Sequence, residues 1–221
     1  MRDWSKRSAR HDRMGSFRVA YWTDDQLRMA AKGFLAEAHP TGTLPIPIEE
    51  IVDLHCQIDI VPVENLNLDG HEAFTSRDRK TIYVEASTYK HKNSNRFRFT
   101  LAHELAHILL HDDVFKAADY TDIAGWKAFL SSIPDDQLQW IERQAFMFAG
   151  FSLVPTEDLS REYAKMAETL SRRGVDIRKL PPQALKQVAK LLGDVFRVSS
   201  GVIHRRAVKE GLWRWDDIPA S

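Results

Sequence analysis

The sequence has little cysteine, no long apolar run and no excess of either charge. Its 221 residues include a single cysteine, Cys56, which excludes an internal disulfide and a four-cysteine zinc site. No apolar run approaches the roughly 18 residues of a membrane span, and the charged N-terminus lacks the apolar stretch of an export signal. We therefore expect a cytoplasmic protein that does not associate with membranes.

Charge is balanced over the whole chain but not along it. Lys plus Arg number 31 and Asp plus Glu also number 31, which excludes a global basic surface for nucleic acid. Residues 1–20 hold six basic side chains against two acidic ones, residues 101–160 hold three against ten, and residues 161–221 hold thirteen against seven. We interpret residues 1–20 as a basic, flexible tail, and an arm that contacts nucleic acid is the alternative.

The composition, with 43% hydrophobic and 28% charged residues, is typical of a folded globular domain and excludes disordered and collagen-like chains. A capping box formed by Thr23 and Gln26 predicts the start of the first helix. Apolar spacing predicts helices over residues 24–38 and 48–54, strands near 58–63, 72–75 and 81–85, and helices near 95–112, 122–131, 135–151, 156–171, 182–195 and 199–210. This order predicts an α+β fold with a small, largely antiparallel sheet of three or slightly more strands.

The predicted helix near residues 95–112 is apolar on nearly every face. Between Phe99 and Leu110 the polar side chains are those of Thr100, His103, Glu104 and His107. A helix that is apolar nearly all round is a buried one, so two histidines and a carboxylate lie where desolvation is costly. A bound metal ion satisfies all three at once.

The spacing of these residues supports a metal site. His103 and His107 are four residues apart, so they project from one face of a helix one turn apart and can chelate one ion. Glu104 can then reach a metal-bound water as a general base, which is the His-Glu-x-x-His arrangement of zinc peptidases. The alternative is a pair of core histidines that hydrogen-bond to backbone carbonyls.

A catalytic zinc site needs a third protein ligand. His111 lies about 12 Å of helix rise beyond His103, too far to share one ion with it, so we interpret it as a helix-end or supporting residue. Glu142 lies beside the apolar stripe of the predicted helix 135–151 and can reach inward. Spacing alone leaves open the alternative that Glu142 is solvated and paired with a basic side chain.

Three motifs follow one another along the chain: Arg-Phe-Arg-Phe-Thr-Leu-Ala-His-Glu-Leu-Ala-His at 96–107, Glu-x-x-Ala-x-x-Phe-Ala at 142–149, and Leu-Val-Pro at 153–155. With these motifs the sequence resembles the ImmA/IrrE-type zinc metallopeptidases over residues 24–160. The resemblance implies one zinc ion per chain with Glu142 as the third ligand. It also implies a zincin-like core over residues 21–155, with a buried active-site helix, followed by a C-terminal helical subdomain over 156–221.

The sequence departs from the family at one position. Family members usually have Asn or Asp directly after the alanine that corresponds to Ala145, where it can orient a ligating histidine, and this chain has Phe146. Loss of such support commonly costs 10–100-fold in metal affinity or activity. His111 and Gln144 are candidates to take over this role.

The resemblance implies a zinc-dependent endopeptidase that cleaves a separate protein, such as a helix-turn-helix repressor or an antitoxin-like partner, in stress, mobile-element or toxin–antitoxin regulation. Zinc on His103, His107 and Glu142 would activate water, and Glu104 would be the general base. We expect the substrate to extend along the sheet edge, at the strand 81–85. Candidate donors for the oxyanion are Tyr89, Tyr120, Tyr163 and the remaining histidines.

Two other functions remain as alternatives. One is a catalytically weak, metal-bound regulator that acts by binding its partner, for which Phe146 is the clue. The other is a direct DNA-binding protein that uses the N-terminal tail and the C-terminal helices, since residues 184–206 are faintly similar to a helix-turn-helix. We interpret that segment first as a packed helical subdomain.

Overall fold

The computed structural model describes residues 18–66 and 70–214, so the predicted basic tail lies almost wholly outside the described residues. Within them the fold is α+β, as predicted. The first lobe comprises helices α1 (Asp24–Ala38), α2 (Ile48–Glu50), the π-helix η1 (Ile51–His55), strands β1 (Asp59–Val63), β2 (Ala73–Thr75) and β3 (Thr81–Glu85), and helices α3 (Ala86–Lys90), α4 (Asn95–Leu110), α5 (Asp112–Ala117), α6 (Ile123–Ser132) and α7 (Asp135–Leu153).

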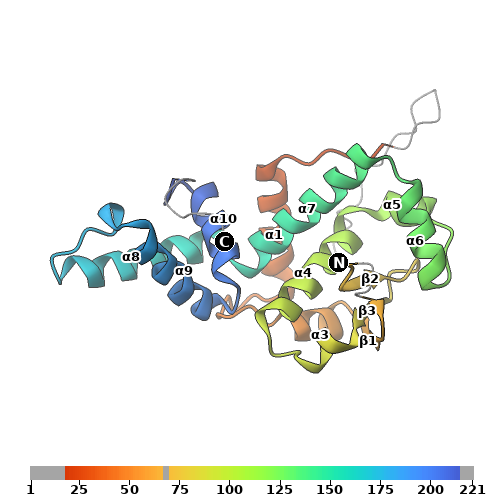
Figure 1. Ribbon diagram of the computed structural model, residues 1–221, viewed down its shortest axis with the longest axis horizontal. Helices are drawn as coiled ribbons and strands as arrows, with labels where there is room; N and C mark the ends of the chain where they lie inside the picture. The colour runs from red at the N-terminus through yellow and green to blue at the C-terminus, as the bar shows by residue number, and fades with distance from the viewer. Residues whose placement is uncertain (1–17, 67–69, 215–221) are drawn as a thin grey trace.

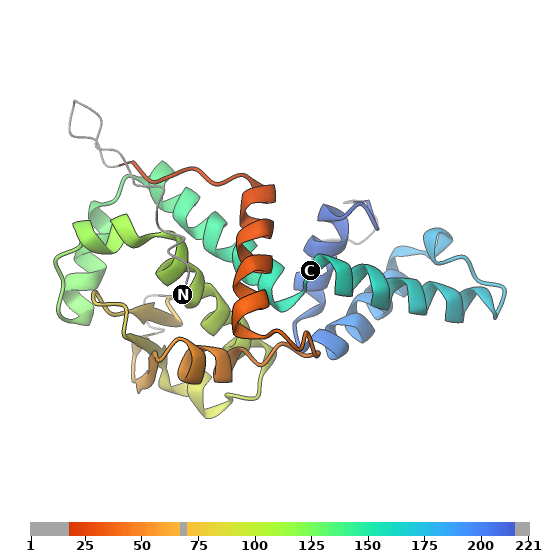
Figure 2. The ribbon, with the colours of Figure 1, turned by 180° about the vertical axis from the view of Figure 1, so that it is seen from behind.

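A second lobe follows, made of helix α8 (Thr156–Ser171), the short 3-10 helix η3 (Ile177–Lys179), and helices α9 (Pro182–Phe196) and α10 (Ser200–Lys209). Figures 1 and 2 show it projecting from the end of α7. The predicted boundary between residues 155 and 156 falls between α7 and α8, but the division into domains stays a prediction. No helix in residues 18–66 or 70–214 has the length and apolarity needed to cross a membrane.

The sheet has three strands in the order β1-β3-β2. Strands β2 and β3 are antiparallel, with Phe74 opposite Tyr83, and β1 runs parallel to β3, with Asp59 opposite Thr81. The sheet is therefore mixed, and the prediction that it is largely antiparallel was wrong for the β1–β3 pair. Residues 76–80 make the tight turn between the antiparallel neighbours β2 and β3, whereas β1 lies at the opposite edge of β3. The apolar alternation within a strand does not indicate which strand it pairs with.

Helices α4 and α7 pack against each other at the centre of the first lobe, and α1 covers α7. The capping box of α1 is confirmed, because the Thr23 hydroxyl accepts from the Gln26 N–H and the Gln26 side chain accepts from the Thr23 N–H. Helix α4 begins after its cap Ser94 and ends at Leu110, slightly earlier than predicted. At His111 the backbone leaves the helical region with φ −117° and ψ 37°, so α5 starts in a new direction.

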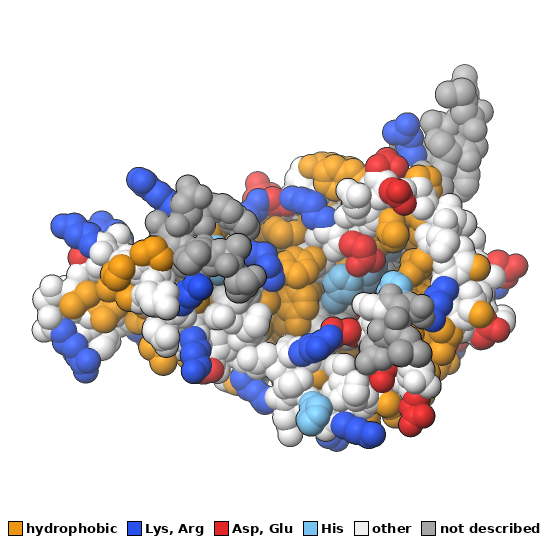
Figure 3. Space-filling model, viewed as in Figure 1, with side chains coloured by type: hydrophobic (Ala, Val, Ile, Leu, Met, Phe, Trp, Pro, Cys, Tyr) orange, Lys and Arg blue, Asp and Glu red, His pale blue; other side chains and the backbone are white. Residues whose placement is uncertain are grey.

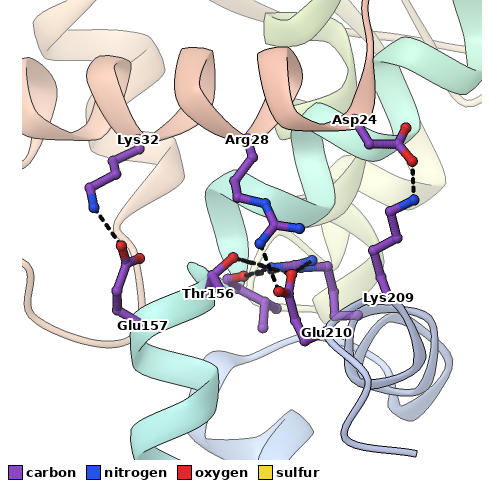
Figure 4. Close-up of polar contacts among 9 residues, drawn as sticks. Asp24, Arg28, Lys32, Thr156, Glu157, Lys209 and Glu210 are labelled. Atoms are coloured by element: carbon purple, nitrogen blue, oxygen red, sulfur yellow. Dashed lines mark hydrogen bonds and ion pairs between the residues drawn. The ribbon is translucent and has the colours of Figure 1, made fainter.

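A buried arginine joins the two lobes. Arg206 of α10 is 4% exposed. Its guanidinium donates to the carbonyl of Val154 at 3.1 Å, to the Thr156 hydroxyl at 3.0 Å and to Glu210 at 2.6 Å. Figure 4 shows Thr156 and Glu210 side by side at this junction. Glu210 in turn accepts from Arg28 of α1 at 2.8 Å. These bonds fix α10 against the end of α7, and so position the side chains that α10 presents to the cavity described below.

Candidate metal centre

Helix α4 presents His103 and His107 on one face, as the four-residue spacing predicts. Their rings lie 4.7 Å apart between centroids, and their Nε2 atoms are 3.0 Å apart. Both side chains are largely buried, 21% and 14% exposed. The two nitrogens therefore point at one common position.

Glu142 on α7 completes the group, because α7 packs directly against α4. Glu142 Oε2 lies 3.1 Å from His103 Nε2, and Oε1 lies 3.6 Å from His107 Nε2. Among the described residues, His103, His107 and Glu142 form a group that could hold a metal ion, because one nitrogen or oxygen atom from each lies within 4.8 Å of the others. The structure thus brings together the three predicted ligands, although their role as ligands stays a prediction.

The spacing of these atoms fits a tetrahedral ion. Ligand atoms about 2.0–2.1 Å from zinc in a tetrahedron lie roughly 3.3 Å from one another. The two imidazole nitrogens are 3.0 Å apart, and the carboxylate approaches them with a different oxygen each, Oε2 at 3.1 Å from His103 and Oε1 at 3.6 Å from His107. Two neutral imidazoles and one carboxylate form the donor set of many catalytic zinc sites. The Glu142 side chain is 49% exposed, so the group remains reachable from solvent on one side, as a site that binds substrate requires.

The surroundings of Glu142, His103 and His107 shift the pKa of each side chain. Burial opposes the charged form of Glu142, but the hydrogen bond from His103 and the nearby histidines outweigh burial and lower its pKa to about 2. Burial likewise opposes charge on His103, yet the hydrogen bond to Glu142 and the charge of Glu104 raise its pKa above the usual value. Burial lowers the pKa of His107 well below the usual value, so that ring is neutral. Glu142 is therefore an anion beside a neutral imidazole.

Glu104 follows His103 on α4, lines the cavity described below and accepts a hydrogen bond from β2. It is 8% exposed, and the hydroxyl of Thr75 on β2 donates to its Oε2 at 2.9 Å. Burial raises the pKa of Glu104 to about 7, although His103 and the Thr75 hydrogen bond oppose the rise. The Tyr120 hydroxyl holds β2 in place by donating to the Thr75 carbonyl at 2.8 Å. Sequence reasoning missed Thr75, because nothing local to a strand threonine marks it as a partner of a helix glutamate.

A cavity of about 690 Å³ opens over these residues. Figure 3 shows histidine side chains in a hollow flanked by hydrophobic ones. One wall consists of residues 70–75 with β2, and another of α6 and α7, including Trp126, Phe129 and Ile133. The second lobe contributes Val202 and Arg205. The sequence did not predict that apolar residues of α6 line this cavity, because that depends on where α6 packs in the fold.

Phe146 and His111 occupy different places around the centre. The Phe146 ring lies 5.0 Å from that of Phe99, the Arg205 guanidinium sits 4.7 Å from its centre, and all three line the cavity. His111 Nδ1 lies 3.0 Å from His107 Nδ1, the nitrogen that faces away from Glu142. His111 therefore lies behind His107, on the side away from Glu142, and its supporting role stays a prediction.

Tyr120 lines the cavity, unlike the other two tyrosines considered as oxyanion donors. Tyr89 packs edge-on against Phe97, and Tyr163 packs near Trp213 in the second lobe. Of the three, Tyr120 is thus the one at the cavity, and its hydroxyl donates to the Thr75 carbonyl of β2.

Comparison with known proteins gives one family and one fold. The peptidase family described as the IrrE N-terminal-like domain matches residues 56–208. A solved structure of a Mycobacterium tuberculosis transcriptional regulator is similar, with a TM-score of 0.51 and 22% sequence identity. The match covers 85% of this chain and 47% of that one, so this chain spans about half the length of the regulator. No curated protein matches the chain.

Proposed function

Because residues 56–208 match it, the chain belongs to the peptidase family of the IrrE N-terminal-like domain, and we propose that it is a zinc-dependent endopeptidase. His103, His107 and Glu142 hold the zinc, and Glu104 is the general base. The observation that carries this proposal is the convergence of three ligand atoms within 4.8 Å beside a buried fourth residue, in a cavity open to solvent. Structural zinc sites usually have four protein ligands, and a three-ligand set is typical of catalysis.

The residues divide the chemistry between them. When bound, zinc supplies the Lewis acidity that makes water nucleophilic near neutral pH. Glu104 accepts a proton from the water that attacks the scissile carbonyl and donates it to the departing amine when the C–N bond breaks. Thr75 orients the Glu104 carboxylate, since its hydroxyl holds Oε2 and leaves Oε1 for the reacting water.

The substrate segment binds in extended form against β2. We expected the strand 81–85 to offer the edge, but β3 is the central strand and pairs on both sides. Strand β2 pairs with β3 on one side, and its residues 73–75 line the cavity. An extended peptide can add to the other side of β2 through backbone hydrogen bonds, which is a common mode of peptide recognition.

The substrate is a separate regulatory protein, such as a helix-turn-helix repressor or an antitoxin-like partner. The regulatory zinc peptidases that this sequence resembles support this part of the proposal, as does the fold shared with a transcriptional regulator. The cytoplasmic location expected from the sequence is where such a partner would be met.

Metal analysis and turnover test the proposal together. We expect about one zinc per wild-type chain and its loss in both His107→Ala and Glu142→Ala. Glu104→Gln should keep the zinc and lose at least a hundredfold in cleavage of a purified helix-turn-helix repressor encoded beside this chain. The peptidases that the sequence resembles are often encoded next to the repressor that they cleave. Zinc that stays bound without Glu142 would contradict the ligand set, and full cleavage by Glu104→Gln would contradict the base.

A further inference from the structure

A chain of hydrogen bonds leads from His107 away from the proposed metal site. His107 Nδ1 lies 3.0 Å from His111 Nδ1, and His111 Nε2 lies 3.1 Å from Gln144 Oε1. Gln144 Nε2 donates to the backbone carbonyl of Ala20 at 3.0 Å. His111 is 2% exposed and Gln144 is 0% exposed, so water does not compete for these bonds.

The Ala20 carbonyl, at the end of this series of hydrogen bonds, determines which atom donates in the bonds that precede it. A carbonyl can only accept, so the Gln144 amide nitrogen faces Ala20 and its oxygen faces His111. An amide oxygen also can only accept, so His111 Nε2 carries a proton. His107 Nε2 faces His103 and Glu142, so in the form that binds a metal through Nε2 the ring proton of His107 is on Nδ1. His107 Nδ1 is then the donor to His111, and His111 accepts at Nδ1 while its Nε2 donates to Gln144.

The consequence appears at the other nitrogen of His107. A neutral imidazole with a proton on Nδ1 has a lone pair on Nε2, and this Nε2 faces His103 and Glu142. We infer that Gln144 and His111 are positioning residues that hold His107 in the one tautomer able to bind a metal through Nε2. This inference rests on the proposed role of His107 as a ligand.

This series of hydrogen bonds can support a ligating histidine although position 146 has no polar side chain. Phe146 points to Phe99 and Arg205, and its ring has no acceptor to offer a ligating histidine. His107 instead donates to His111, one helical turn further along α4, and the bond is passed on to α7 at Gln144. Support of this kind fixes the orientation of a ligating ring and raises its basicity.

A second hydrogen bond fixes the backbone around Ala20 against α7. The Val19 N–H donates to Gln137 Oε1 at 2.9 Å, and Gln137 and Gln144 lie seven residues, or about two turns, apart on one face of α7. The segment before α1 therefore lies along α7 (Figure 2), with the Ala20 carbonyl fixed opposite Gln144. These residues precede the family match at 56–208, so this anchor lies outside the matching part of the chain.

The tautomers can be measured directly by long-range ¹⁵N–¹H correlation spectroscopy on the full chain, stripped of metal with EDTA. We expect the Nδ1–H form for His107 and the Nε2–H form for His111. In Gln144→Leu, which keeps a similar side-chain volume but removes both amide hydrogen bonds, both rings should show mixed tautomers. A wild-type His107 protonated on Nε2 would overturn the inference.

Zinc affinity, measured by competition with a chromophoric chelator, gives a second readout. Gln144→Leu and His111→Phe should each weaken zinc binding by about 10–100-fold. Their double variant should bind about as well as the weaker single variant, because both changes break one chain. Wild-type affinity in Gln144→Leu, or fully additive losses, would overturn the inference.

Leu153→Ala is the matched control for lost stability. Leu153 is 0% exposed on the same helix α7, so its truncation should lower the melting temperature and leave zinc affinity unchanged. If Leu153→Ala weakened zinc binding as much as Gln144→Leu, the effect would be one of stability and the inference would fail. If the wild type bound no zinc, the proposed function would fail, and the tautomers of His107 and His111 would still decide this inference.

Discussion

The Thr75 hydroxyl donates a hydrogen bond to Glu104 Oε2 across the gap between β2 and α4, at 2.9 Å. This bond connects the strand proposed to bind substrate with the residue proposed to move the proton. A strand that shifts when substrate binds would therefore also shift the base.

Removing that bond should slow cleavage without removing the metal. Thr75→Val keeps the side-chain shape, and a hydrogen bond to a charged group contributes about 1.5–3 kcal/mol. We expect kcat to fall roughly tenfold or more, with zinc content unchanged. Thr81→Val, in the neighbouring strand β3, is the control and should keep wild-type kcat. Equal kcat in Thr75→Val and wild type would show that Thr75 does not orient Glu104.

The sequence was sufficient for the parts of the site that depend on local geometry. His103 and His107 share a face because they are four residues apart on one helix, and the apolar neighbours of Glu104 predict its burial. Glu142 lies far along the chain, and spacing alone left its role open. A family resemblance predicted it as the third ligand, and the packing of α7 on α4 brings it to the histidines.

The parts that the sequence did not predict depend on contacts between distant segments. The parallel pairing of β1 with β3 joins two strands that are separated in sequence by β2. The bond from Thr75 to Glu104 and the bond from Gln144 to Ala20 join residues far apart in sequence. No periodicity marks such contacts, because apolar patterns report which face of an element is buried and not what covers it.

The single cysteine should react slowly in the folded protein. Cys56 follows η1 half-buried against the core, and burial raises the pKa of its thiol to about 11. Since the thiolate is the reactive form, its population at pH 8 is about a hundredfold smaller than for an ordinary thiol. Alkylation by iodoacetamide, followed by mass spectrometry, should be slower by that factor than in urea.

The pH dependence of this reaction provides a further check. Alkylation of the folded protein should accelerate about tenfold per pH unit from pH 8 to 10, because the thiolate fraction rises in that proportion below the pKa. A rate that levels off below pH 9 would mean that burial does not raise the thiol pKa.

The buried arginine between the lobes should be important for stability. Arg206→Met keeps much of the side-chain volume but leaves Glu210, whose side chain is 7% exposed, with one fewer cationic partner. Breaking a buried pair by removing one partner costs about 3–5 kcal/mol. We expect a loss of about that size in the free energy of unfolding in urea. Arg205→Met, at the adjacent exposed residue, is the control and should lose less than about 1 kcal/mol.

Phe146 should contribute to substrate binding and not to metal binding. Its ring lines the cavity between Phe99 and Arg205 and does not contact His107 through a polar atom. Phe146→Ala removes apolar surface that a substrate side chain can cover, at about 25 cal/mol per Å². We therefore expect KM to rise severalfold while kcat and zinc content stay near wild type.

The control for Phe146→Ala is Met147→Ala, the next residue of α7, which packs against the core and does not line the cavity. It should lose stability and keep its KM. If Phe146→Ala instead lost zinc, the ring would be supporting a ligand after all. If Phe146→Asn bound zinc more tightly than wild type, the hydrogen-bond chain through His111 and Gln144 would be an incomplete substitute for a polar residue at this position.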